Sequence, residues 1–528
     1  MRTRLAEDLW GAKITLPVSE ANRASLTVPA AFDSSSEPAV AQERHFSGAA
    51  RLAEIIQTVL TGLILALIFR AFLVEPFIIP TGSMADCLLG AHATRTCPAC
   101  GWEFNFAPLR SGTSTGVGFV CPPEVICPNC HLRIATVAEQ TVPRAGDRIL
   151  VHKWPSALPG LLRPQRWDVI VFRDPADPDQ HYIKRLAGLP GETVEILDGD
   201  VFIDGRIARK PPHVQAGLWS VVFDQAHHPV GSSPAANKRR WVTASAAHPA
   251  GWSGLVSRVI RYDGLDDQSR TVVFDPGDDA EYLSDLLAYN RHSSGAFIGD
   301  LRLVGELSIQ AGEGDLRWEL ERPPHRCAAA LQADGAVRLE VSRIDEPGRS
   351  MVSVSARLEH AVRARPLVFE FGHVDYRVYL WIDGREVLST RAGEYEPALE
   401  ELRGGAAQRP VRLCMTARNL RFELRRLRID RDVHYTCRAP QAQRAFPGEP
   451  FALRADEYFV LGDNSPDSHD SREWTEVGPH LAADYRPGTV PVDQIVGQAA
   501  FVYLPSLLPL DARGRWFVPD LGRVRFVR

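Results

Sequence analysis

The chain has 528 residues, which is too long for a single hydrophobic core and predicts about two to four domains of ~100 to 200 residues each. The formal net charge of −5 gives no indication of a nucleic-acid partner. Nine cysteines are too few for a scaffold held together by disulfides, and four of them form two Cys-Pro-X-Cys pairs, an arrangement typical of metal binding.

Residues 1–50 contain few large apolar side chains, and we expect them to form a mobile tail. Residues 51–74 contain a nearly continuous apolar run of the ~20 residues that a bilayer crossing requires, which predicts a transmembrane anchor. Arg70 lies near its far end, where the long side chain can reach the lipid headgroups. A cleaved secretory signal fits less well because no small-X-small site follows the run, and a buried core helix is the remaining alternative. A single crossing would leave residues 75–528 on one side of the membrane.

A candidate nucleophile follows the apolar run directly. The segment 75–84, Glu-Pro-Phe-Ile-Ile-Pro-Thr-Gly-Ser-Met, places Ser83 between a glycine and a methionine. A serine hydroxyl needs a base to take its proton and donors to hold the oxyanion. Lys184 lies in a strand-like segment, and a lysine that is removed from water loses its proton more easily, so its amine can act as that base. Taken alone, a lysine on a strand is more often solvated.

A third polar stretch lies much later in the chain. Residues 457–472 run from a short apolar strand into a loop crowded with Asn, Asp, Ser and Arg side chains. A loop of this composition is usually a solvated turn or a metal-binding loop. It can also form a buried hydrogen-bond network that orients a catalytic base.

The two cysteine pairs predict a metal site. Two Cys-X-X-Cys knuckles in one segment are typical of a zinc ribbon, in which four thiolates bind zinc tetrahedrally. Cys121 lies in the same segment and could replace one ligand. Disulfides or redox-active dithiols are the alternative if the segment faces an oxidising compartment. Four thiolates leave no open coordination position, so we expect a structural zinc on Cys97, Cys100, Cys127 and Cys130.

In their order along the chain, these stretches resemble the type I signal peptidases, a family of membrane-bound serine peptidases with a Ser-Lys dyad. The matching positions are residues 70–84, 146–151, 166–191 with the hairpin after them, and 458–472, with a weaker match at 495–497. The resemblance implies that Ser83 is the nucleophile and Lys184 the general base.

The resemblance also implies roles for further residues. Thr81 would complete the oxyanion hole with the Ser83 amide, and Ser468 would hydrogen-bond the lysine. Asp470 and Arg472 would form a supporting ion pair. Shallow apolar pockets would accept only small side chains before the cleaved bond, and they would be lined by Phe77, Ile79, Met84 and Ile183.

The sequence departs from the family pattern at three places. The residues after the nucleophile, 84–88, lack the usual proline, and residues 465–467 replace a more polar triplet. Gln498 stands where a lysine is common. None of these changes removes a group that the mechanism needs, so they concern substrate preference and loop conformation.

The fold implied by the resemblance is mainly β: a signal-peptidase-type β catalytic core behind one N-terminal transmembrane helix, with two insertions. The core would comprise residues 75–90, 146–211 and 447–528. The zinc-ribbon-like insertion would cover residues 91–145, and a β-rich insertion residues 212–446.

The second insertion contains strand-like runs and Asp-Gly turns that predict an antiparallel β-sandwich at about 295–435. Residues 371–384 are similar to the core strands of concanavalin-like and laminin-G-like sandwiches. Such folds bind carbohydrate or protein ligands, but many of them are purely structural. His373 and Asp375 could bind a metal, but alternate strand positions more often display solvated side chains, so both residues are left unassigned.

The predicted function is that of a membrane-bound serine endopeptidase that removes N-terminal signal peptides from exported precursors, without a cofactor for catalysis. Its partners would be precursor proteins, membrane lipid and a carbohydrate or protein ligand of the sandwich, but no nucleic acid. We expect a single-pass protein of the cytoplasmic (inner) membrane with its catalytic domain on the extracytoplasmic side. The alternative is a catalytically inactive, membrane-anchored binding or scaffold protein that uses the sandwich. A triad through His469 and Asp470 is disfavoured because these residues are adjacent on one loop.

Overall fold

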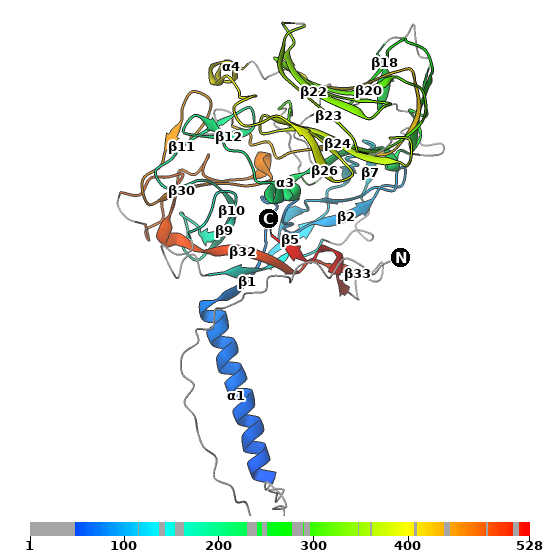
Figure 1. Ribbon diagram of the computed structural model, residues 1–528. Helices are drawn as coiled ribbons and strands as arrows, with labels where there is room; N and C mark the ends of the chain where they lie inside the picture. Colours follow the sequence, from blue (N-terminus) through cyan, green and yellow to red (C-terminus); the bar gives the residue numbers. More distant parts are fainter. Residues whose placement is uncertain are drawn as a thin grey trace, which may run out of the picture. The chain divides into compact units, whose positions relative to one another are not determined.

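The computed structural model describes most of the chain and shows a mainly β protein (Figure 1). The described residues are 48–113, 116–136, 143–153, 163–229, 240–244, 251–276, 283, 289, 296–346, 348–359, 362–405, 409–437, 444–481, 484–509 and 517–527. The predicted tail lies outside them up to residue 47. By contacts the chain divides into two units, Met1–Leu63 and Ile64–Arg528.

Helix α1 covers Gly48–Phe72, where the sequence predicts the transmembrane anchor. Its sequence is apolar for most of its length, with Arg70 in the last turn. In the described part of the chain, no helix has both the length and the hydropathy that a membrane crossing needs.

The sheet that carries the candidate catalytic residues is antiparallel. Its central strand β9 is buried on both faces: Val169 and Val171 belong to one hydrophobic cluster, and Ile170 and Phe172 belong to another. A strand buried on both faces needs a continuous apolar run, which this segment has. The strand order is β1 (Val74–Ile78), β8 (Arg148–His152), β32 (Ile495–Leu504), β9 (Val169–Arg173), β10 (His181–Gly188), β30 (Glu457–Leu461) and β31 (Val490–Pro491), and β35 (Arg525–Phe526) also pairs with β32.

A smaller sheet contains the predicted hairpin. The turn between its two longest strands is formed by Asp198 and Gly199, with φ of 52° and 85°. Two consecutive left-handed residues are typical of the tight turn whose twist matches the paired strands. The strand order is β13 (Arg206–Ile207), β12 (Asp200–Ile203), β11 (Thr193–Leu197) and β29 (Phe451–Ala452).

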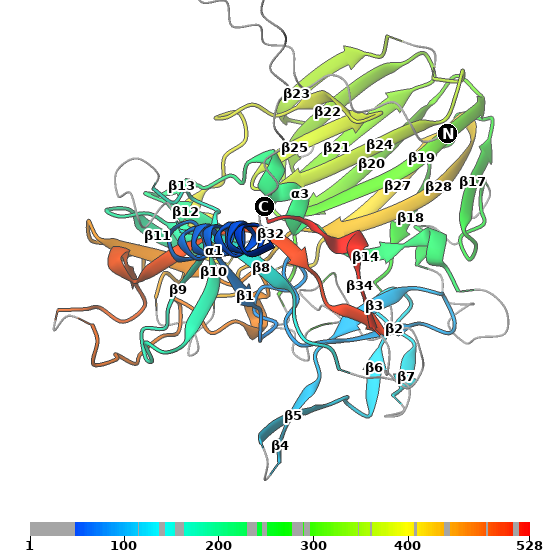
Figure 2. The same ribbon diagram turned by 90° about the horizontal axis from the view of Figure 1, so that it is seen from below.

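Two large antiparallel sheets form a sandwich (Figures 1 and 2). One contains β16 (Trp252–Ser253), β17 (Val259–Gly264), β28 (Leu420–Arg431), β19 (Leu301–Ala311), β24 (Leu367–Val374), β25 (Arg377–Ile382) and β26 (Arg385–Ser389), with β14 (Ser220–Asp224) also paired to β28. The other contains β15 (Trp241–Thr243), β18 (Arg270–Phe274), β27 (Arg412–Arg418), β20 (Asp315–Arg322), β21 (His325–Gln332), β22 (Ala336–Arg343) and β23 (Ser350–Arg357).

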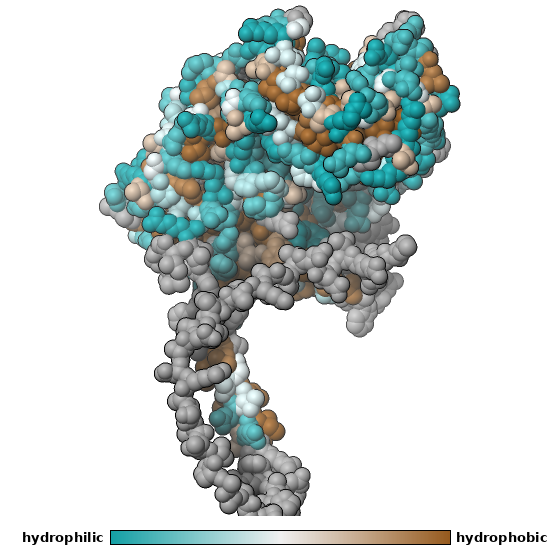
Figure 3. Space-filling view, viewed as in Figure 1, coloured by the Kyte–Doolittle hydropathy of each residue, from teal (hydrophilic) through white to brown (hydrophobic). Residues whose placement is uncertain are grey.

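Strict alternation of buried and less buried residues along β19 and β20 explains why these strands pack face to face. Trp318 of β20 stacks on Phe369 of β24 with ring centroids 4.5 Å apart, which joins the two layers. Figure 3 shows hydrophobic side chains (brown) between the layers and hydrophilic ones (teal) over their outer faces. This arrangement fits the predicted sandwich.

The remaining described elements are short. Four two-stranded hairpins join β2 (Ala93–Thr96) to β3 (Glu103–Phe106), β4 (Leu109–Thr113) to β5 (Gly116–Val120), β6 (Glu124–Ile126) to β7 (Arg133–Ala135) and β33 (Leu507–Pro509) to β34 (Phe517–Pro519). Two short α-helices are α3 (Pro212–Leu218) and α4 (Leu399–Arg403). The prediction of a mainly β protein with several sheets is therefore confirmed, and the proposed domain boundaries stay predictions.

Candidate active site

The structure brings Ser83 and Lys184 into direct contact. Ser83 lies in a series of turns that follows β1, and Lys184 lies in β10. Lys184 Nζ donates a hydrogen bond of 2.7 Å to Ser83 Oγ, although 100 residues separate the two in sequence. Both residues are buried. This is the distance at which a proton can pass between a hydroxyl and an amine.

Burial determines the charge state of Lys184. Desolvation lowers the pKa of the Lys184 amine from its usual 10.5 to about 8, although the nearby Asp470 carboxylate opposes this shift. Arg472 acts in the same direction as burial. A substantial fraction of Lys184 is therefore neutral close to physiological pH, which is the form that can accept a proton.

Asp470 and Arg472 form a buried ion pair beside the lysine. Arg472 Nε donates to Asp470 Oδ1 at 2.8 Å, and Arg472 Nη2 donates to Oδ2 at 2.7 Å. Burial opposes the charge on Asp470, but Arg472 outweighs it and lowers the pKa of this carboxyl. The Ser468 hydroxyl donates to Asp470 Oδ2 at 2.9 Å. Ser468 thus lies in the network around Lys184, and its predicted hydrogen bond to the lysine stays a prediction.

Gly462 separates this network from the nucleophile. It directly follows β30, and its amide donates to Asp470 Oδ2 at 2.9 Å. A Cβ atom at this position would lie 2.1 Å from Ser468 Oγ and 2.6 Å from the Ser83 carbonyl oxygen. The two chain segments can approach this closely because residue 462 has no side chain. Its motif was recognisable in the sequence, but this steric role was not.

Asn464 holds the backbone of the nucleophile segment. Its amide N–H donates to the Ser83 carbonyl at 3.0 Å, and its side-chain Nδ2 donates to the Gly82 carbonyl at 2.9 Å. The neighbouring Asp463 accepts two hydrogen bonds of 2.7 Å from Arg185, the residue after Lys184. Sequence reasoning assigned no role to Asn464, Asp463 or Arg185. Their position next to motif residues in the sequence was the signal that could have identified them.

The remaining predicted site residues lie around the dyad. Thr81 is exposed, two residues before Ser83. The four residues predicted to line substrate pockets belong to one hydrophobic cluster, in which three are buried and Phe77 is partly buried. The cluster contains Phe77, Ile79, Met84 and Ile183.

A large cavity lies beside the segment that follows Ser83. Its volume is about 1060 Å³, and its walls include residues 85–87 and 89 together with residues 102–107 and 216–223. Neither Ser83 nor Lys184 lines it. Asp86 and Cys87, which belong to the segment that departs from the family pattern, thus line a cavity to which both predicted insertions contribute.

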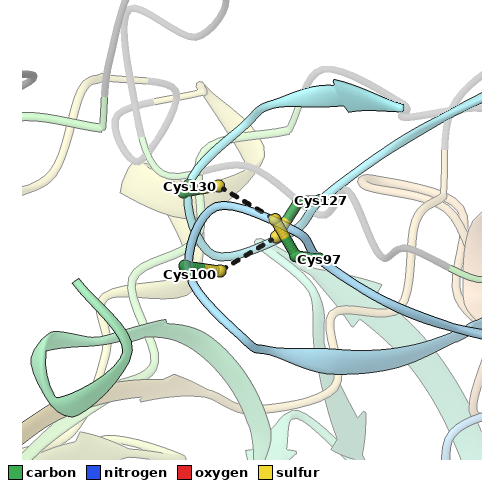
Figure 4. A group of neighbouring side chains, drawn as sticks. All are labelled: Cys97, Cys100, Cys127 and Cys130. Carbon is green, nitrogen blue, oxygen red and sulfur yellow. Dashed lines mark hydrogen bonds between the residues drawn. The ribbon is translucent and has the colours of Figure 1, made fainter. Parts of the chain in front are cut away.

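The four cysteines of the predicted ribbon converge on a common centre (Figure 4). The Sγ atoms of Cys97 and Cys130 lie 3.6 Å apart, as do those of Cys100 and Cys127. Four thiolates at ~2.3 Å from a tetrahedral zinc lie ~3.8 Å apart, whereas disulfide sulfurs lie ~2.05 Å apart. The short contacts also cross between the two knuckles. The geometry therefore fits one metal ion better than two disulfides within the knuckles.

A second group of buried carboxylates is less suited to a metal. One oxygen each from Asp200, Asp300 and Asp375 lies within 4.8 Å of the others. Arg322 pairs with Asp200 and Asp300, and Lys210 pairs with Asp375. Two basic side chains already neutralise much of this charge, so the cluster is an ion-pair network.

The chain is similar to known peptidases in part of its length. Residues 132–218 and 379–504 match the sequence profile of the family described as Signal peptidase, peptidase S26. The matched residues include Lys184 and Ser468, and the match begins after Ser83. The match covers the stretches 146–151, 166–191, 458–472 and 495–497 of the resemblance but not 70–84, and it also includes residues 379–446 of the predicted β-rich insertion.

Curated relatives show the same likeness. The signal peptidase I of Pseudomonas fluorescens is 32% identical over 144 residues, which cover 27% of this chain and 34% of that protein. The signal peptidase I of Rickettsia canadensis is 28% identical over 149 residues, covering 27% and 39%. The chain thus spans less than half the length of these relatives.

The solved structures that resemble this chain do so with low scores. The laminarinase of Rhodothermus marinus is 12% identical, with a TM-score of 0.29, and the match covers 41% of this chain and 98% of that one. A carbohydrate-binding module of Bacillus subtilis is 11% identical, with a TM-score of 0.22, and covers 37% and 97%. At scores this low the likeness carries no conclusion about fold or ligand.

Proposed function

We propose that this chain, which is related to the S26 signal peptidases and hence to the serine peptidases, removes N-terminal signal peptides from exported precursors by a Ser-Lys dyad. The observation that carries the proposal is the buried 2.7 Å hydrogen bond between Lys184 Nζ and Ser83 Oγ. The lowered pKa of Lys184, about 8, supports it because a neutral amine is the form that acts as a base.

In the first half of the reaction, the precursor binds as an extended strand, and its scissile carbonyl approaches Ser83. Neutral Lys184 takes the Ser83 hydroxyl proton as Oγ attacks the carbonyl carbon. The Ser83 amide and the Thr81 hydroxyl would hold the oxyanion. The C–N bond then breaks, the leaving amine takes the proton from Lys184, and the signal peptide remains as an ester on Ser83.

The second half releases the signal peptide. Lys184 takes a proton from water, and the resulting hydroxide attacks the ester carbonyl. The ester bond breaks, and Ser83 regains its proton from Lys184. Asp470 and Arg472 would support this cycle by holding the loop that packs against the lysine, since their ion pair is buried and bidentate.

Membrane anchoring by α1 belongs to the proposal. The described apolar side chains of the helix, such as Leu52, Ile55 and Val59, are exposed to an extent unusual for residues of this kind. A lipid environment would cover them, and holding the enzyme at the bilayer would bring it to precursors that are tethered there. The extracytoplasmic placement of the catalytic part, the lipid contact and the sandwich's carbohydrate or protein ligand stay proposals of the same kind.

The cysteine cluster is proposed to hold a structural zinc. In both knuckles, the residue after the second cysteine donates its amide to the carbonyl of the first: Gly101 to Cys97 and His131 to Cys127, each at 2.9 Å. Such matched turns direct both thiolates of a knuckle to one centre. Metal analysis should find about one zinc per chain. A Cys97→Ser/Cys127→Ser variant should lose it, whereas Cys414→Ser, a buried cysteine of β27, should retain it.

The test of the proposed function is cleavage of a presecretory peptide by the purified full chain in detergent. Ser83→Ala should reduce kcat by at least ~10⁴-fold, because no other group forms the acyl-enzyme. The matched control is Ser353→Ala, an exposed serine of β23, which should retain full activity. Undiminished cleavage by Ser83→Ala would contradict the dyad. A wild type without cleavage would favour the inactive scaffold.

A further inference from the structure

The nucleophile lies on a loop that closes on itself. The Ala91 amide donates to the Pro80 carbonyl at 3.3 Å, which joins the two ends of the loop. A Cβ atom at Gly90 would lie 2.2 Å from the carbonyl carbon and oxygen of Thr81, so the backbones are in close contact there. Residues 80–91, called the nucleophile loop here, therefore form one compact unit, and a displacement of any part is passed to Ser83.

The catalytic core holds several parts of this loop. Asn464 donates from its backbone to Ser83 and from its side chain to Gly82, as described above. These hydrogen bonds fix the carbonyls of residues 82 and 83. Later in the loop, Asp147 accepts a hydrogen bond from the Leu89 amide and donates one to the Leu89 carbonyl, and Arg525 donates to the Cys87 carbonyl. The Cα face of Gly82 and the Ala91 carbonyl are contacted from outside this core.

A tyrosine from the predicted β-rich insertion packs against the same loop. Tyr289 is 2% exposed, and its hydroxyl donates to the Ala91 carbonyl at 2.7 Å. Its ring belongs to a small hydrophobic cluster with Ala85 and Leu89 of the nucleophile loop. A Cβ atom at Gly82 would lie 1.9 Å from Cε1 of the same ring. The Tyr289 side chain thus contacts Gly82 before Ser83, Ala85 and Leu89 after it, and Ala91 at the end of the loop.

We propose that Tyr289 is a positioning residue that holds the nucleophile loop so that the Ser83 hydroxyl meets Lys184. This inference rests on the proposed peptidase function. It assigns a task to the inserted segment: the catalytic arrangement is completed by a residue from outside the catalytic sheet. Gly82 is part of the same contact, because only a residue without a side chain leaves room for the ring.

The expected consequence is a loss in kcat more than in KM. The Tyr289 hydroxyl bonds the Ala91 carbonyl and its ring packs on loop residues, so its removal would leave the reacting groups present but misplaced. A displacement of ~1 Å at a reacting atom can cost ~100-fold in rate. A merely structural residue would instead lower the amount of folded protein and leave the kcat of the folded fraction unchanged.

Four variants form the test, with cleavage of the presecretory peptide as the first measurement. Tyr289→Ala should lower kcat by about tenfold with KM changed less than about threefold. Tyr289→Phe, which keeps the ring and loses one hydrogen bond, should lose only about two- to fivefold. Gly82→Ala should lose about 100-fold because its methyl group collides with the ring.

The double variant Gly82→Ala/Tyr289→Ala decides the matter, because it removes the collision. It should be at least about tenfold more active than Gly82→Ala alone, which is the non-additivity expected of residues in contact. The proposal is overturned if the double variant is no more active than Gly82→Ala, or if Tyr289→Ala keeps the wild-type kcat. Tyr379→Ala, a buried tyrosine of β25 bonded to Glu370, is the matched control and should keep kcat.

Hydrogen exchange separates this proposal from the proposed function. The amides of Ala85 and Leu88 donate within the loop, to Gly82 and Met84. They should exchange at least about tenfold faster in Tyr289→Ala than in the wild type or Tyr379→Ala. If the wild type cleaves nothing but this exchange increases, the peptidase assignment fails and the contact stands. If cleavage is normal and exchange is unchanged, the positioning role fails alone.

Discussion

Among the described residues, two lysines are buried, and their surroundings shift their pKa values in opposite directions. Lys184 contacts the Ser83 hydroxyl, and burial lowers its pKa to about 8. Lys210, at the end of the small hairpin sheet, forms an ion pair with Asp375 and another with Asp432 at 2.9 Å. Burial opposes its charge, but these carboxylates outweigh it and hold the pKa of Lys210 well above the usual value.

The difference between them is the charge in contact with the amine. Lys184 has a carboxylate nearby, but Arg472 already neutralises Asp470 with two hydrogen bonds. Lys210 contacts carboxylates that lack a comparable basic partner of their own. Burial alone therefore does not make a lysine a base; an uncompensated carboxylate beside it reverses the outcome. The first environment suits proton transfer and the second suits a structural ion pair.

The largest expected effect is the loss of activity when Lys184 is replaced. Lys184→Met keeps an apolar stem of similar size but removes the amine, so kcat should fall by at least ~10⁴-fold. Steady-state cleavage of the presecretory peptide measures this. Because the amine is an unfavourable charge in this site, thermal stability should be unchanged or higher. Activity within tenfold of the wild type would contradict the base role.

Replacing Lys210 by methionine should instead lower stability and leave activity nearly unchanged. Lys210→Met leaves Asp375 and Asp432 buried without their shared partner, which should lower the free energy of unfolding by about 3 to 5 kcal/mol. Denaturant unfolding followed by tryptophan fluorescence measures this, and kcat of the folded fraction should stay within about threefold. Lys153→Met is the matched control: its ion pair with Glu75 is more exposed and should contribute less than about 1 kcal/mol. Equal destabilisation by Lys210→Met and Lys153→Met would contradict a special contribution of the buried Lys210 ion pairs to stability.

The two lysines also differ in how much of their setting the sequence predicted. Lys184 stands in a motif whose partners, Ser83 and Ser468, stand in motifs of their own, so their meeting could be expected before the structure was known. Lys210, Asp375 and Asp432 are far apart in the chain, and although Asp375 stands in a segment similar to known sandwich strands, no pattern linked these three residues. Only the packing of the hairpin against the sandwich brings them together. No local sequence pattern indicates that contact.

The same limit explains what was missed at the site itself. Gly462 and Asn464 were within a recognised motif, but the space that one leaves and the backbone that the other holds depend on the approach of the nucleophile loop. Tyr289 had no motif at all.

The transmembrane anchor was predicted from the apolar run of 51–74, whereas no described helix meets the requirements for a crossing. The sandwich could be predicted from strand-like runs because alternating strands carry their pattern locally, whereas the β catalytic core was implied by the family resemblance.

Gly462 offers a way to disturb only the surroundings of Lys184. Gly462→Ala would introduce a methyl group against Ser468 and the Ser83 carbonyl, and kcat should fall by about 100-fold through misplacement of the nucleophile. The peptide cleavage assay measures it. Gly522→Ala is the control, because a Cβ atom there would come no closer than 3.5 Å to another residue. Wild-type activity in Gly462→Ala would show that the close approach is not needed.

The smallest expected effect is a displacement of the pH profile. The neutral form of Lys184 is the active one, so kcat/KM should rise with pH through an apparent pKa of about 8. Asp470→Asn removes the carboxylate that favours the lysine's charge and leaves Arg472 unpaired. The rising limb should therefore move to lower pH, by on the order of one unit. Asp375→Asn, the corresponding change beside Lys210, should leave the limb in place.

Stability should change with pH in opposite senses at the two lysines. Unfolded lysine has a pKa of ~10.4, so between about pH 8 and ~10.4 the unfolded chain binds more protons at Lys184 than the folded one. That site gains stability as pH rises through this window. The raised pKa of Lys210 contributes stability that is fully present below ~10.4 and is lost only as pH rises through its folded value. Comparing pH-dependent unfolding of Lys184→Met and Lys210→Met with the wild type would measure each contribution, and slopes of the same sign would contradict the two charge environments.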